Sequence, residues 1–499
     1  ATFSCDESSY GKRTFQVGEF KIKEMMKTKN ISFAAFAFLP ALSLSAKEEC
    51  GQSPNVVMFL IDDLGWNDFG CYGSRFYQTP TIDSLAHAGV LFTDGYAACT
   101  VSSPTRAALM TGKYPARLHL TDWIAGWNYP WAKLRIPEWT KYLPLEEKTV
   151  AEYLKDSGYQ TWHVGKWHLG DDEKYWPENQ GFDVNIGGNY KGAPIKNKEG
   201  CNGYFSPYCL PRLENGEEGE YLTDRLTDEA VRLIEKQGDR PFFLNMSHYA
   251  VHTPLGAKPE LERKYEALAD SSYFHNNATY AAMIQSVDES LNRILEVLKR
   301  KGVLDNTLII VTSDNGAVHK ISKSYPLRKG KGAEYEGGVR VPLIVYWKGH
   351  TPVNKKVHTP VITMDLFSTI IDAAGVKAKD ETIDGVSLWP VIKGEKESER
   401  PIFWHYPHYH NGGARPYSAV RLGDWKLIKQ YESDTCELYN LKEDIGERKN
   451  LRYDCPQKAD ELSRVLEKWL KTVDAQLPSE NPTWDAKRER KTGKYAGLD

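Results

Sequence analysis

Continuous apolar runs alternate with amphipathic segments over most of this chain. Such runs predict strands buried on both faces, as in parallel sheets, and apolar residues spaced three or four apart predict helices. The predicted strands are residues 55–61, 90–93, 159–164, 241–246, 307–312 and 341–347. The predicted helices are residues 81–89, 105–111, 148–158, 280–300 and 365–374. This alternation predicts an α/β fold in which helices sandwich a large, mostly parallel sheet.

The pattern changes near Pro390. Short strand-like stretches follow it, and then comes a predicted helix over about residues 459–473. These stretches are residues 401–404, 418–421, 425–429 and 437–439. We therefore expect residues 47–389 to form the main domain and residues 390–499 to form a smaller α+β subdomain.

The first 46 residues have a different character. A short basic stretch at residues 25–30 precedes a mostly apolar run at 31–44, and small residues and then charges follow. This order is typical of a secretory signal peptide, here residues 25–46, and the run is too short to span a bilayer. A buried helix is the alternative. Residues 1–24 are interpreted as a leader or a mis-assigned start, and export to the periplasm or the exterior is expected.

Composition and charge exclude several classes of protein. The chain has 499 residues, of which 41% are hydrophobic, and its formal net charge is −3. An intrinsically disordered chain has fewer apolar residues, and a nucleic-acid-binding protein usually has a basic excess. No apolar run beyond residue 46 is long enough for a membrane span. Cys201 with Cys209, and Cys436 with Cys455, are plausible disulfides, although the sequence alone does not fix the pairing.

Polar residues lie just beyond four of the predicted strands. They are Asp62 and Asp63, Lys166 and His168, His248 and His252, and Asp314 and Asn315. Any one of these would usually be a turn or a helix cap. Because the carboxyl ends of parallel strands meet at one edge of a sheet, the four together predict a single crevice.

These residues divide into two chemical groups. Carboxylate and amide oxygens are preferred by Ca²⁺ or Mg²⁺ rather than Zn²⁺, and those of Asp62, Asp63, Asp314 and Asn315 form such a set. Fixed cationic donors stabilise an oxyanion. The candidates for that role are Arg106, Lys166, His168, His252 and Lys331. Ser102 precedes a predicted helix, where it either caps the helix or faces an anion at the helix N-terminus.

Taken together, these segments resemble the type I sulfatases of the alkaline-phosphatase-like superfamily. The family signature is Cys or Ser, any residue, Pro, any residue and Arg, followed by a helix and Thr-Gly. Here it is matched by Ser102, Pro104, Arg106 and Thr111-Gly112. The other matching segments, in the family's order, are Asp62-Asp63, Gly165 to His168, His252 to Pro254, Ser313 to Gly316 and Gly330 to Gly332. The resemblance extends from residue 55 to the C-terminus and makes residues 47–389 the expected catalytic domain.

The resemblance implies a specific mechanism. A radical maturase that works without oxygen would oxidise Ser102 to formylglycine, whose hydrate attacks sulfur and forms a covalent sulfo-enzyme intermediate. One Ca²⁺ ion would be held by Asp62, Asp63, Ser102, Asp314 and Asn315. The implied roles are support of the nucleophile for Arg106, sulfate binding for Lys166 and Lys331, general base for His168, and general acid for His252, which His248 could share.

The expected substrate is a sulfated oligosaccharide. The chain resembles bacterial exo-sulfatases that act on galactose or N-acetylgalactosamine sulfates, and we expect a 4-sulfate. The candidate sugar-binding residues are His248, Asp122, Trp123 and His405. Two alternatives remain open at this point: a phosphomonoesterase or phosphodiesterase of the same superfamily, and a catalytically dead glycan-binding protein.

Overall fold

The computed structural model describes residues 53–127, 129–198, 200–395 and 399–487. The predicted leader and signal peptide lie outside these described residues, and so they stay predictions. Within the described ranges, no helix is both long enough and apolar enough to cross a membrane.

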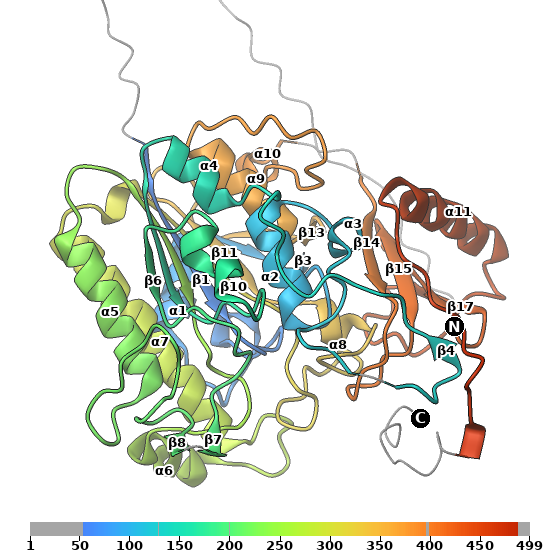
Figure 1. Ribbon diagram of the computed structural model, residues 1–499, viewed down its shortest axis with the longest axis horizontal. Helices are drawn as coiled ribbons and strands as arrows, with labels where there is room; N and C mark the ends of the chain where they lie inside the picture. Colours follow the sequence, from blue (N-terminus) through green and yellow to red (C-terminus); the bar gives the residue numbers. More distant parts are fainter. Residues whose placement is uncertain (1–52, 128, 199, 396–398, 488–499) are drawn as a thin grey trace, which may run out of the picture. The chain divides into compact units, whose positions relative to one another are not determined.

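An eight-stranded sheet forms the centre of the fold, in the order β12-β2-β11-β10-β1-β9-β5-β6 (Figure 1). Strand β1 (Asn55–Ile61) pairs in parallel with β10 (Thr307–Ser313) and β9 (Phe242–Ser247), and β9 pairs in parallel with β5 (Gln160–Gly165). Strand β11 runs antiparallel to both of its neighbours. The remaining strands of this sheet are β2 (Val90–Phe92), β6 (Val184–Ile186), β11 (Leu343–Tyr346) and β12 (Lys355–Val357). The predicted mostly parallel α/β fold is confirmed.

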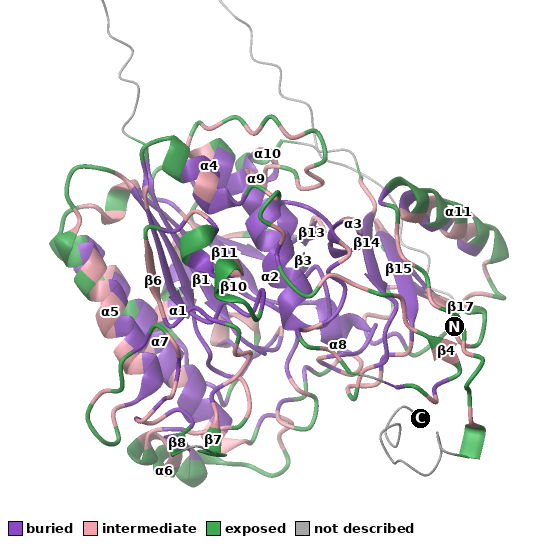
Figure 2. Ribbon diagram, viewed as in Figure 1, coloured by how far each residue is buried: buried purple, intermediate pink, exposed green. Residues whose placement is uncertain are grey.

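Helices cover both faces of this sheet, and the alternation of side chains along β1 shows how. Val57, Phe59 and Ile61 pack into the apolar cluster formed with α1 (Pro80–Ala88), α5 (Leu222–Lys236) and α7 (Ala278–Arg300). Val56, Met58 and Leu60 point to the other face, toward α2 (Ser102–Thr111), α4 (Val150–Asp156) and α9 (Met364–Ala373). Burying both faces explains the unbroken apolar run. Figure 2 shows that the central strands are largely buried, as α2 is, whereas α5 is exposed on its outer side.

The sequence analysis does not predict α5 or α6 (Pro259–Leu268). In α5, the buried residues Leu222, Leu226, Ala230 and Ile234 recur every fourth position, which is a helical signal. The other helices are α3 (Pro115–Leu118), α8 (Glu336–Val339) and α10 (Trp389–Lys393). The short pairs are β13 (Val361–Ile362) with β3 (Gly95–Tyr96), β18 (Ser479–Glu480) with β4 (Leu134–Arg135), and β7 (Lys196–Lys198) with β8 (Cys201–Asn202).

The C-terminal part contains the strands and the helix that the sequence predicts for an α+β subdomain, and its strands form a separate antiparallel sheet. Its strands, in order, are β14 (Ile402–Tyr406), β15 (Tyr417–Leu422), β16 (Trp425–Gln430) and β17 (Thr435–Asn440). Helix α11 (Pro456–Thr472) packs on this sheet. Buried Lys426 of β16 joins this sheet to the main part through an ion pair with Glu336 of α8 at 3.0 Å, and it also pairs with Glu447 of the C-terminal part at 2.8 Å. The boundary at residue 390 stays a prediction.

One of the two plausible disulfides is present. Cys201 and Cys209 are bonded in the loop region around β7 and β8. Cys436 and Cys455 are both free thiols, and so the second expected pair is wrong.

Candidate functional site

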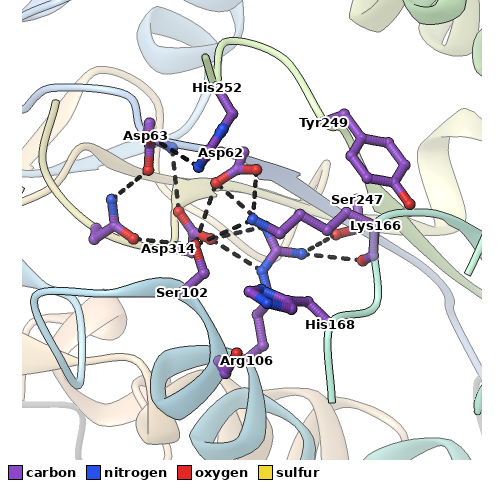
Figure 3. Close-up of polar contacts among 12 residues, drawn as sticks. Asp62, Asp63, Ser102, Arg106, Lys166, His168, Ser247, Tyr249, His252 and Asp314 are labelled. Atoms are coloured by element: carbon purple, nitrogen blue, oxygen red, sulfur yellow. Dashed lines mark hydrogen bonds and ion pairs between the residues drawn. The ribbon is translucent and has the colours of Figure 1, made fainter. Parts of the chain in front are cut away.

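The predicted metal ligands lie together where β1 and β10 end. These strands are parallel neighbours, and their register pairs Ile61 with Ser313, so the residues that follow each strand become neighbours. Asp62, Asp63, Asp314 and Asn315 occupy these positions, and all four are buried. Figure 3 shows the side chains of Asp62, Asp63 and Asp314 gathered beside Ser102.

Ser102 is the first residue of α2, and its hydroxyl lies within this cluster. Its Oγ is 3.3 Å from Asp62 Oδ1 and from Asn315 Oδ1, which it can donate to, and it accepts from Lys166 Nζ at 3.2 Å. Val101 is the N-cap residue of α2, and its side chain makes no capping hydrogen bond. Ser102 is therefore not a helix cap. Its hydroxyl lies between carboxylate and amide oxygens on one side and the Lys166 ammonium on the other, at the positive end of the α2 helix.

Each of the three carboxylates has a lysine or arginine within 2.8 Å. Lys166 Nζ lies 2.7 Å from Asp62 Oδ2, and Lys331 Nζ lies 2.6 Å from Asp63 Oδ1. The Arg106 guanidinium donates from Nε and Nη2 to Asp314 Oδ2 at 2.9 and 2.8 Å.

A further Arg106 contact holds the guanidinium in place from β9. Its Nη1 donates to Ser247 Oγ at 2.6 Å, a partner that the sequence analysis does not predict. The guanidinium is therefore fixed at both ends, between β9 and the end of β10.

Burial shifts the pKa values of charged groups in this cluster. Burial, assisted by the neighbouring Asp314 and Asp63, raises the pKa of Asp62 to about 8, although Lys166 opposes the shift. Burial likewise lowers the pKa of Lys166. Both shifts have one cause, because a low-dielectric site disfavours every uncompensated charge.

The residues present fit a divalent cation. Asp63 Oδ2 is buried and has no hydrogen-bond partner among the described residues. Donor atoms of Asp62, Asp63 and His252 lie within 4.8 Å of one another, and Asn315 and Asp314 add further oxygens. A donor set this rich in carboxylate and amide oxygen is the kind that Ca²⁺ and Mg²⁺ prefer.

Two histidines have tautomers that the backbone fixes. His168 Nε2 lies 2.5 Å from the Ile124 carbonyl oxygen, which can only accept, so Nε2 carries the proton. Nδ1 of His168 then carries a lone pair, and it is buried with no hydrogen-bond partner in the part of the chain that the structure describes. His252 Nδ1 donates to the Thr253 carbonyl at 2.5 Å, which leaves Nε2 facing Asp63 Oδ2 at 3.5 Å. Burial lowers the pKa of both rings.

A cavity of about 690 Å³ opens onto this cluster. It is lined by Ser102, Asp63, His168, His252 and Lys331, which are all predicted site residues. Loops contribute the rest of the wall, including Trp123, Trp127, Lys320, Lys329 and His410. A buried charged cluster at the base of an open cavity of this size is suited to binding and transforming a small anionic group.

The comparisons with known proteins agree with this geometry. The family model described as "Sulfatase" matches residues 54–376, which is more than half of the chain. This chain belongs to the sulfatase family. It is a sulfuric ester hydrolase. A second model, "N-sulphoglucosamine sulphohydrolase, C-terminal", matches residues 330–476 of the sulfatase.

Named relatives cover nearly the whole sulfatase chain. It is 31% identical to a protein named "Sulfatase" from Formosa agariphila, over 90% of this chain and 94% of that protein. It is 33% identical to the human N-acetylgalactosamine-6-sulfatase, over 86% and 87% of the two chains. Among solved structures, Ps i-CgsB in complex with k-i-k-neocarrahexaose matches with a TM-score of 0.72 and 30% identity, covering 88% of this chain and 96% of that one.

Three of the four predicted sugar-binding residues of the sulfatase do not line the cavity. His248 points to the opposite face of the sheet from Ser247, because successive side chains of a strand alternate. Its Nε2 contacts Ser290 Oγ of α7 at 3.0 Å, and so it does not share the position of His252. His405 of β14 is bonded to Ser418 Oγ at 2.7 Å and to a backbone carbonyl at 2.9 Å.

Asp122 is buried behind the cavity wall. It accepts from Tyr406 O–H at 2.6 Å and from the backbone N–H of Trp123 at 2.9 Å. Asp122 thus contacts the backbone of Trp123, the one predicted sugar-binding residue that does line the cavity.

The sequence analysis misses two aromatic residues of the wall. Trp127 meets Trp123 edge to face, with ring centroids 5.5 Å apart. His410 accepts from the Gly412 N–H through Nδ1 at 2.9 Å, so a neutral His410 carries its proton on Nε2. The sequence signal for His410 is the stretch from Trp404 to His410, which is rich in aromatic residues and histidines. Only the fold shows that His410 lines the cavity.

Proposed function

We propose that this sulfatase uses a formylglycine derived from Ser102 to remove a sulfate ester from galactose or N-acetylgalactosamine. The observation that carries the proposal is the position of Ser102 Oγ, 3.3 Å from Asp62 and Asn315 and 3.2 Å from Lys166. A plain serine sulfate has no second hydroxyl to drive release of the group. A hydrated aldehyde at this position would supply both the nucleophile and that second hydroxyl.

The metal in this proposal is one Ca²⁺ ion. Asp62, Asp63, Asp314, Asn315 and residue 102 would hold it, and it would supply positive charge that favours ionised oxygen at residue 102 and on the sulfate. Arg106 keeps Asp314 in place through its two hydrogen bonds.

The remaining site residues handle charge and protons. Lys166 and Lys331 present ammonium groups to the sulfate oxygens, where charge builds up during transfer. The His168 Nδ1 lone pair is free to take a proton from a hydroxyl of residue 102, because Nε2–H is committed to Ile124. His252, when protonated on Nε2, is the donor to the leaving alcohol.

The sugar would bind above this cluster, within the 690 Å³ cavity. Trp123 and Trp127 supply flat apolar faces, and His410 supplies a hydrogen-bond donor. We propose exo action on a 4-sulfate. The relatives named N-acetylgalactosamine-6-sulfatases make the 6-sulfate the necessary comparison. Export and activation by an anaerobic radical maturase belong to the same proposal.

The first experiment tests conversion of Ser102. The protein is produced with and without a radical maturase, and the mass of the peptide containing Ser102 is measured by mass spectrometry. Conversion removes two hydrogens, about 2 Da, and should accompany activity. Ser103→Ala is the matched control, since the motif leaves position 103 open. Loss of conversion in Ser102→Ala but not in Ser103→Ala is expected.

Turnover is then measured on 4-sulfated and 6-sulfated galactose and N-acetylgalactosamine, and on a phosphate monoester. Hydrolysis of sulfate esters by converted protein alone supports the proposal. Equal activity of the unconverted serine form, or preference for the phosphate ester, would refute it.

A further inference from the structure

The cavity wall carries more positive charge than one sulfate ester needs. Among the described residues that line it, Asp63 is the sole carboxylate, whereas Lys320, Lys329 and Lys331 are lysines. Lys331 is paired with Asp63 at 2.6 Å. Lys320 and Lys329 have no ion-pair partner within the described ranges. Two cations are therefore left over at the wall.

The fold holds these two lysines together in one loop. Asp314 and Asn315 follow β10 directly, and residues 317–331 then form a loop. The loop ends at Lys331, which pairs with Asp63. Lys331 N–H donates to the Ala317 carbonyl at 2.8 Å, and His319 Nδ1 donates to the Lys329 carbonyl at 3.0 Å. These bonds tie the two ends of the loop, so Lys320 lies close to Lys329 in space.

Lys329 also has a backbone conformation that is unusual for its residue type. Its φ is 61°, in the left-handed region that residues other than glycine rarely adopt. The loop therefore keeps a lysine at a position where glycine would be the unstrained choice, directly at the cavity wall.

We propose that Lys320 and Lys329 form a second anion-binding subsite, which selects substrates that carry another negative group near the sulfate being removed. This rests on the proposed function and narrows its substrate class to polyanionic glycans. The second group is a sulfate on the same sugar or a sulfate or carboxylate on the adjoining one. Each ammonium group donates charge-assisted hydrogen bonds to such an oxyanion.

The experiment compares kcat/KM for three substrates. N-acetylgalactosamine 4-sulfate has one anionic group. N-acetylgalactosamine 4,6-disulfate adds a sulfate on the same ring, and a 4-sulfated N-acetylgalactosamine linked to a uronic acid adds a carboxylate on the neighbour. The readout is the ratio of kcat/KM for each dianion to that for the monoanion, which also shows where the second group lies.

The variants are Lys320→Ala with Lys329→Ala, and Lys323→Ala as the control. Lys323 is an exposed lysine of the same loop that does not line the cavity. Replacing it removes one positive charge from the loop, as each of the other two substitutions does, but leaves the cavity wall unchanged. We expect the double variant to lower the ratio about tenfold for at least one dianion, and the control to leave it unchanged. High salt should reduce the wild-type ratio.

An unchanged ratio in the double variant, or an equal fall in the control, would overturn this proposal. If the converted wild type hydrolyses none of the sulfate esters, it is the proposed function that fails. Calorimetric binding of the disulfated sugar to Ser102→Ala protein then still tests the subsite. Roughly tenfold weaker binding after loss of both lysines supports it, and equal binding refutes it.

Discussion

Gly192 provides a sharp test of the role given to His168. A methyl group added at position 192 would lie 2.5 Å from Cε1 and 2.6 Å from Nε2 of the His168 ring. Ordinary carbon contacts are about 3.5–4.0 Å, so the ring must move by roughly 1 Å. The ring is buried and bonded to the Ile124 carbonyl at 2.5 Å, so this movement breaks its alignment. A displacement of this size at a reacting group costs about a hundredfold in rate.

The assay is pre-steady-state release of alcohol by Gly192→Ala protein. Because His168 acts after the alcohol leaves, the variant should release a burst of about one equivalent and then turn over about a hundredfold more slowly. Gly238→Ala is the control, since a methyl there meets nothing within 4 Å. Unfolding midpoints of both variants are measured alongside. Steady turnover of Gly192→Ala at the control rate would refute the assignment of His168 as base.

Three further predictions concern pH, packing and metal. Burial raises the pKa of Asp122 from 3.8 to about 7, so its contribution to stability is full below pH 4 and is lost as the pH rises through 7. Between pH 4 and pH 8 the free energy of unfolding of Asp122→Asn, measured with denaturant, should therefore rise relative to that of the wild type by up to about 4 kcal/mol. A difference between the two proteins that does not change with pH would contradict this. Lys426→Met leaves buried Glu447 without its ion-pair partner and leaves buried Glu336 with Arg340 alone, and it should cost about 3–5 kcal/mol, measured by the same method. Lys429→Met at an exposed ion pair should cost under about 1 kcal/mol. Removing divalent ions with a chelator should abolish turnover and lower the unfolding midpoint, and added Ca²⁺ should restore both; a protein indifferent to chelation would argue against the metal.

The sheet and its polar edge follow from local pattern. An apolar run ending in Asp62-Asp63 and another ending before Asp314-Asn315 predict buried parallel strands and a shared edge, because burial on both faces excludes polar residues until the strand ends. The same rule gives no direction for an individual strand. The antiparallel course of β11 depends on the path of the chain between β10 and β11, which no local pattern encodes.

Individual side chains of the wall were harder to predict. His248 and His252 are four residues apart and have the same chemistry, yet His248 contacts α7 whereas His252 faces Asp63. His405 and His410 also differ in position: His405 is bonded to a backbone carbonyl away from the cavity, whereas His410 lines the cavity. Composition selects the right segment in both cases. The choice within the segment depends on where the strand ends and which face each residue takes.

The sequence by itself determined the fold class, the family resemblance and the identity of the charged groups, because these rest on residue type and order. Only the tertiary structure decided which groups meet. It brings Ser102, Asp62 and Lys166 together from separate elements, fixes the tautomer of His168 through a backbone carbonyl, and holds Lys320 beside Lys329 at the cavity wall. Distances between residues far apart in the chain are set by packing of the whole sheet, and that is a property no local stretch of sequence contains.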